Sequence, residues 1–223
     1  MNGMEIAARY SLPPNLYGYC GTSSFVNDFR SEKNLEEAFK SFHAYKYLDL
    51  IAKENGMKPF DEQIVRAFWI GNELLNISED ALRDFVENQL IPGNPERAKK
   101  LSEKLPKGIL PHHTFNVLYV QFVTDSVPRT IENFDSCCVT SAEIISISGK
   151  KARVVRNSIS FDKGFVFREK EEEIDIERNG FRFDDFEQGD TVSVHWGMAI
   201  EKLDRKNSDL LQKYSLINMN LCS

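Results

Sequence analysis

The feature that most constrains the fold of this 223-residue chain is a change in hydrophobic periodicity along it. From about residue 35, through the first half of the chain, apolar residues recur at steps of three and four, the spacing that places them on one face of an α-helix. From residue 138 onward, valine, isoleucine, phenylalanine and threonine become more frequent, and turn residues separate short runs of them. The sequence therefore predicts an α+β protein, with an α-helical N-terminal domain at 1–130 and a β-rich domain at 131–223.

Four helices are predicted in the first half. Asn34 and Gly56 flank the first, whose apolar positions run through 35–52. The second helix passes through Ile64 and Trp69, the third begins at Ser78, and the fourth extends from Pro95 to Leu105. Residues 1–30 are predicted to be irregular, because prolines and glycines interrupt an aromatic-rich stretch. The apolar run 115–123 fits either a helix or a strand.

The second half contains five candidate strands separated by turn residues such as Ser148-Gly149 and Asn179-Gly180. Five short strands with such turns predict a small OB-like β-barrel, because closure removes exposed strand edges. The predicted strands are 138–147, 151–156, 164–168, 172–177 and 191–195. We expect a helix directly after Gly197, and helical spacing returns from Leu210 to Leu221.

Charge and hydropathy narrow the classes of function. The formal charge is −6 and no basic patch stands out, so nucleic-acid binding is disfavoured. No apolar run approaches the roughly 20 residues that a transmembrane helix needs. Glu5 and Arg9 interrupt the N-terminal apolar stretch, which argues against a signal peptide. We therefore expect a cytoplasmic protein that uses neither nucleic acid nor a membrane.

The cysteines do not form a recognisable disulfide or zinc pattern. Four cysteines are too few for a disulfide scaffold in a chain of this length, and none forms a C-x-x-C pair. Reduced thiols in such a protein are either small core residues or reactive ligands. Cys137, placed directly before the first predicted strand, is expected to be accessible, with Cys138 pointing to the opposite side.

Two segments of the second half carry a family resemblance. Residues 189–204 fit the pattern GD-x-V-x-V-H-x-G-x-A-I-x-K-[IL]-D without a gap. Upstream, Cys137 precedes an alternating strand and the Gly149 turn, with Ser141-Ala142 where the pattern has Pro-Gly. Through these segments, residues 136–215 resemble the HypC/HupF family of hydrogenase assembly chaperones.

This resemblance implies a function in the maturation of NiFe hydrogenase. In the HypC/HupF family, the cysteine that matches Cys137 holds an iron atom bearing cyanide and carbonyl ligands. The histidine that matches His195 assists, by ligation or by hydrogen bonding. The resemblance thus implies iron as the cofactor, and a maturation factor or the hydrogenase large subunit as the protein partner. Without the resemblance, the simpler interpretations are that Cys137 is a structural cysteine and that His195 is a hydrogen-bonding histidine.

The first half carries a second resemblance. It contains the segments RY-x-x-PPN-x-x-GYCG, WxGN-x-LL and PHH-[ST]-F. With these, the whole chain resembles an uncharacterised bacterial and archaeal family that has a HypC-like C-terminal end. The resemblance marks Cys20, His112 and His113 as further candidate metal ligands. Because His112 and His113 are adjacent, at most one of them should join a given site.

Other functions remain open at this point. Cys20 could be the nucleophile of an enzyme, with His112 or His113 as its base. Alternatively, the barrel binds a protein partner without any metal. A third possibility joins the two halves, with Cys20 supplying a second thiol to an iron atom on Cys137.

Overall fold

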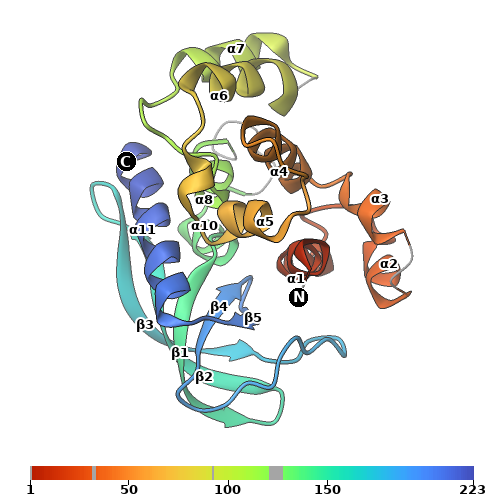
Figure 1. The fold of residues 1–223 in the computed structure, drawn as a ribbon. Helices are drawn as coiled ribbons and strands as arrows, with labels where there is room; N and C mark the ends of the chain where they lie inside the picture. Colours follow the sequence, from red (N-terminus) through yellow and green to blue (C-terminus); the bar gives the residue numbers. More distant parts are fainter. Residues whose placement is uncertain (1, 32–33, 92, 121–127) are drawn as a thin grey trace.

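The structure is a computed structural model that describes residues 2–31, 34–91, 93–120 and 128–223. Figure 1 shows the helices of the N-terminal half gathered beside a β-barrel, with the C-terminal helix α11 (Arg205–Leu221) running along the barrel. The predicted fold class is confirmed: N-terminal helices precede a closed barrel of five strands, and a helix follows it. Among the described residues, no helix is both long and apolar enough to cross a membrane.

The prediction of an irregular segment at 1–30 is wrong. This segment forms helices α1 (Gly3–Leu16) and α2 (Phe25–Ser31). Pro13 and Pro14 lie near the C-terminal end of α1, where they remove few helical hydrogen bonds. The apolar side of α1 is buried against helix α5 (Glu62–Trp69), and most helical stability in proteins comes from such packing.

The helix predicted over 35–52 is divided in two. Phe42 has extended backbone, with φ −80° and ψ 144°, and its ring stacks on that of Phe39 in the core. The other three helices predicted in the first half are confirmed, and the side chains of Ser78 and Asn94 cap two of them. The run 115–123 lies partly outside the described residues. The further helical elements are α3 (Leu35–Phe39), α4 (His43–Glu54), η1 (Glu73–Leu75), α6 (Glu79–Phe85), η2 (Val86–Leu90), α7 (Pro95–Glu103), α8 (His113–Phe115), η3 (Asn116–Val120) and α10 (Ile131–Cys137).

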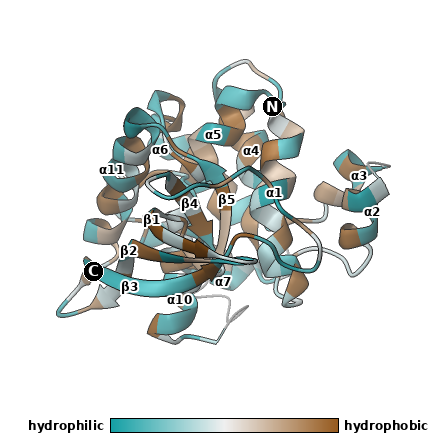
Figure 2. Ribbon diagram, turned by 90° about the horizontal axis from the view of Figure 1, so that it is seen from below, coloured by the Kyte–Doolittle hydropathy of each residue, from teal (hydrophilic) through white to brown (hydrophobic). Residues whose placement is uncertain are grey.

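The strands of the barrel follow the order β1-β2-β3-β5-β4, and β4 pairs with β1 to close it. They are β1 (Thr140–Ser148), β2 (Lys151–Phe161), β3 (Phe165–Asp175), β4 (Thr191–His195) and β5 (Met198–Lys202). The two strands predicted at 164–168 and 172–177 are one strand, β3, because it pairs with β2 without interruption. The middle of β3 is hydrophilic and exposed (Figure 2), so it lacks the apolar alternation by which strands are predicted.

The helix predicted directly after Gly197 is also a strand, β5. Trp196 and Gly197 have φ values of 51° and 66°, the backbone of a two-residue hairpin turn. The turn reverses the chain, so that Met198 pairs with His195. The C-terminal helix begins only after Asp204, whose side chain accepts a hydrogen bond from the backbone of Asn207.

One hydrophobic cluster crosses the boundary between the two halves. It joins residues of α1, α4 and α5 to Met198 and Ile200 of β5 and to Tyr214 of α11. The helices and the barrel therefore share a core, and side chains from both halves can meet at one place.

We predict that Gly71→Ala lowers the free energy of unfolding by about 2–5 kcal/mol. Gly71 has φ of 100°, and a Cβ there would lie 2.4 Å from a ring carbon of Tyr214. Urea denaturation measures the loss. Gly108→Ala is the control, since Gly108 has φ of 81° but faces open space. Equal losses in both variants would contradict tight packing between Gly71 and Tyr214.

Candidate metal centre

Three potential metal ligands converge inside the molecule. His113 begins α8, Cys137 ends α10 and His195 ends β4. Their donor atoms all lie within 4.8 Å of one another. The three residues are 5%, 3% and 1% exposed, respectively. Across the part of the chain that the structure describes, no other cluster of His, Cys, Asp or Glu side chains has this geometry.

The two adjacent histidines have different surroundings. Nδ1 of His112 lies 2.8 Å from the hydroxyl of Thr114 and accepts the backbone N–H of that residue, which caps α8. The ring of His113 packs 4.4 Å from that of Trp69 and 5.2 Å from that of His195. Only His113 of this pair joins the cluster.

His195 is oriented by the N-terminal helix. Its Nδ1 lies 2.6 Å from the backbone carbonyl oxygen of Tyr10 in α1. A carbonyl can only accept, so Nδ1 carries the ring proton and Nε2 holds a lone pair. Nε2 is buried without a hydrogen-bonding partner, and so is Nδ1 of His113. Buried polar atoms in this condition are rare in folded proteins, and each one calls for an explanation.

Burial keeps both imidazoles neutral. It lowers the pKa of His195 to about 4, although the nearby backbone of Tyr10 and Cys137 opposes the shift. It also lowers the pKa of His113 well below the ordinary value, and the neighbouring His195 and His112 add to this effect. A histidine binds a metal in its neutral form, so both rings can act as ligands near neutral pH.

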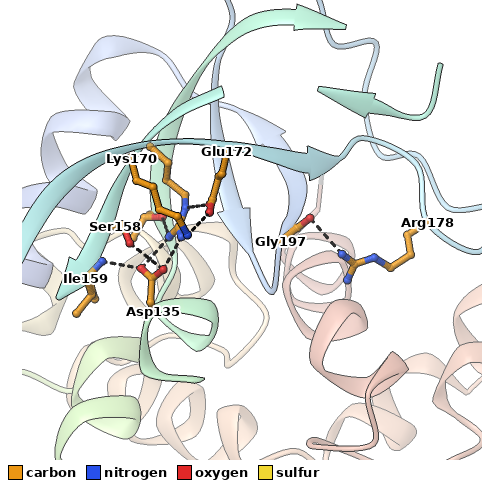
Figure 3. A network of polar contacts seen from close by, with 9 residues as sticks. Asp135, Ser158, Ile159, Lys170, Glu172, Arg178 and Gly197 are labelled. Carbon is orange, nitrogen blue, oxygen red and sulfur yellow. Dashed lines mark hydrogen bonds and ion pairs between the residues drawn. The ribbon is translucent and has the colours of Figure 1, made fainter. Parts of the chain in front are cut away.

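Cys137 is held in place by a buried ion pair between Arg156 and Asp135, which lies two residues before the cysteine. The carboxylate of Asp135 accepts hydrogen bonds from the guanidinium of Arg156 at 2.6 and 3.0 Å, from the hydroxyl of Ser158 and from the backbone of Ile159. Figure 3 shows these contacts tying α10 to the barrel. Glu172 also pairs with Arg156. Burial lowers the pKa of the guanidinium, but Asp135 and then Glu172 outweigh this effect and raise it.

Trp196 packs in the same hydrophobic cluster as Cys137. Its backbone N–H donates to the carbonyl of Ser136, and the rings of Tyr17 and Tyr19 lie 5.6 and 4.7 Å from its ring. A surface hollow of about 380 Å³ lies beside these aromatic residues and Ser136, the neighbour of Cys137 in the chain, and charged side chains complete its lining: Glu173, Asp175 and Arg178. This hollow is therefore adjacent to the buried cluster, on the solvent side of Trp196.

The other cysteines lie outside the cluster. Cys20 is half-buried beside the helical core, and burial raises the pKa of its thiol to about 11, which disfavours the nucleophilic thiolate. Cys138 is buried, and desolvation raises the pKa of its thiol as well. The expectation that Cys137 is accessible is wrong, because the end of α10 and Trp196 enclose it.

Sequence patterns named the three residues of the cluster but missed the residues that hold them in position, namely Tyr10, Asp135 and Arg156. The contribution of Tyr10 is a backbone carbonyl, which no side-chain pattern reveals. Asp135 stands alone before the cysteines, and Arg156 is 21 residues away from it. The tandem prolines of α1 were the one available signal, because they mark a helix with unpaired carbonyls.

Comparison with known proteins identifies the family. Residues 1–223 match the family described as "Family of unknown function (DUF6390)", so the chain belongs to it. No curated protein and no solved structure matches the chain. The expected membership of an uncharacterised family is thereby confirmed. The HypC/HupF resemblance receives no support from these comparisons and stays a prediction.

We predict that the metal-free protein loses stability as the pH falls. Burial lowers the pKa of His112 to about 3 from an ordinary value of 6.5, so its contribution is complete above pH 6.5 and is lost as the pH falls toward 3. His112→Asn keeps a helix-capping side chain but removes the titrating group. The slope of its unfolding free energy against pH should therefore be smaller than that of the wild type, by up to about 1.4 kcal/mol per pH unit. Urea denaturation at several pH values measures this, and identical slopes would contradict it.

We predict that Asp135→Ala lowers the free energy of unfolding by about 3–5 kcal/mol, because it leaves the guanidinium of Arg156 buried without its main partner. Asp162→Ala is the control, since the ion pair of Asp162 with Arg168 is more than half exposed. It should cost roughly 0–1 kcal/mol. Similar losses in both variants would show that the buried ion pair does not anchor α10.

Proposed function

We propose that this member of the DUF6390 family is an accessory protein of metalloenzyme assembly, of the kind that matures NiFe hydrogenase. Its cargo is an iron fragment, held by the thiolate of Cys137 with His195 and His113 as further ligands. The single observation that carries the proposal is the convergence of one thiol and two neutral imidazoles within 4.8 Å in the interior.

The donor set suits such a cargo. Thiolate and imidazole are soft and borderline ligands that favour iron, zinc or copper over magnesium or calcium. Two of the nitrogen atoms are buried without hydrogen-bonding partners, so a bound metal would satisfy them. An iron atom that brings cyanide and carbonyl groups supplies its own remaining ligands, so three protein donors are sufficient for it.

The side chains around Cys137 also suit an iron fragment that is bound and later passed on. Cys137 packs among the apolar side chains of Val117, Phe134, Trp196 and Met219, which exclude water. An apolar shell around a metal restricts solvent access to it. We infer that the hollow beside Trp196 is the docking site of the protein partner, a maturation factor or the hydrogenase large subunit, because it is the surface next to the buried cluster.

Infrared spectroscopy with parallel metal analysis tests the proposal. The protein would be purified anaerobically from cells that express hydrogenase maturation genes. We predict carbonyl and cyanide stretching bands together with bound iron in the wild type, and the loss of both in Cys137→Ala. His113→Ala and His195→Ala should lower the iron content.

Cys138→Ala is the matched control, because Cys138 adjoins Cys137 and is equally buried but lies outside the cluster. Its iron content should equal that of the wild type. Zinc without infrared bands would retain the metal site but contradict the iron cargo. Metal-free protein in all samples would contradict the proposal and leave a barrel that only binds a partner. Loss of iron in Cys20→Ala would add a second thiol to the site.

A further inference from the structure

The tandem prolines of α1 create a defect at one specific carbonyl. In an α-helix each carbonyl accepts the N–H of the residue four positions later, and in a tighter turn the N–H three positions later. For Tyr10 these donors would be Pro14 and Pro13, and proline has no N–H. The carbonyl of Arg9 loses only its donor at Pro13, because Leu12, three residues after Arg9, keeps its N–H. Tyr10 is thus the one residue of α1 that loses both donors to the prolines.

The carbonyl freed in this way is the one that accepts from His195. The distance from Nδ1 of His195 to the carbonyl oxygen of Tyr10 is 2.6 Å, and both residues are buried. The ring of Pro14 also displaces the carbonyl four residues earlier, which turns such carbonyls away from the helix axis. The defect therefore both frees the acceptor and directs it outward.

Tyr10 is fixed to the barrel by its own side chain. Its hydroxyl lies 2.8 Å from the hydroxyl of Ser193 in β4 and donates to the carboxylate of Glu201 in β5 at 2.7 Å. Arg66 pairs with the same carboxylate, and the ring of Tyr10 stacks on that of Trp69 at 5.0 Å. These contacts hold the backbone of Tyr10 beside the end of β4, where His195 lies.

We propose that Pro14 is a positioning residue of the metal centre. By leaving the Tyr10 carbonyl without its α-helical donor, it selects the His195 tautomer that is protonated at Nδ1. Nε2 then remains as the nitrogen available to a metal. The effect on metal affinity rests on the proposed function, whereas the selection of the tautomer does not.

The test restores the missing donor. In Pro14→Ala the N–H of residue 14 can bond to the Tyr10 carbonyl and compete with His195. In Pro13→Ala the restored N–H faces Arg9 in α-helical geometry, so this variant is the matched control. Alanine is a better helix former than proline, so both variants should fold.

Nitrogen-15 NMR of the histidine rings in the metal-free protein is the first measurement. We expect a single Nδ1-protonated tautomer of His195 in the wild type and in Pro13→Ala, and a mixture of tautomers in Pro14→Ala. The second measurement is a Co²⁺ titration, followed by the thiolate-to-metal absorption band. Affinity should fall about 10-fold in Pro14→Ala, the usual effect of losing a contact that orients a ligand.

The outcomes separate the two proposals. An unchanged tautomer in Pro14→Ala would overturn the positioning role, whatever the metal affinity. Equal shifts in Pro13→Ala and Pro14→Ala would also overturn it, because a general disturbance of α1 would then be the cause. A changed tautomer in a protein that binds neither Co²⁺ nor iron would support the positioning of His195 and reject the metal function instead.

Discussion

The contact between helix α1 and the barrel is the constraint on which the candidate site depends. Tyr10 is buried and bonds to the barrel twice, through its hydroxyl to Ser193 and Glu201 and through its carbonyl to His195. A buried polar group without a partner is costly, so each of these bonds penalises any other placement of the helix. The histidine, the helix and the last two strands therefore hold one another in a fixed arrangement.

The sequence predicted the fold class from hydrophobic periodicity, and it named all three residues of the cluster through the two family resemblances. The strands with regular alternation were predictable, and so were the two ends of β3, but their continuity was not, because the middle of β3 is charged on both faces and only its pairing with β2 defines it. The strand β5 follows a turn in which Trp196 adopts a positive φ, a conformation that a non-glycine residue seldom adopts. Pattern rules therefore assigned the segment after Gly197 to a helix.

The spatial arrangement of the site could not be predicted from the sequence alone. Only long-range packing brings His113, Cys137 and His195 together, and the choice between His112 and His113 depends on the short helix that His112 caps. The buried pair of Asp135 with Arg156 belongs to the same class of feature. Charged residues far apart in a sequence give no local sign that they will pair in the interior.

The three ligands come from positions 113, 137 and 195, on both sides of the change in sequence character. During synthesis the N-terminal part of a chain folds first, because it emerges first from the ribosome. The helices can form early, but the last donor, His195, appears only when strand β4 has been made. The three donors are thus present together only after residue 195 has been made, and a chain that stops before that residue lacks one of them.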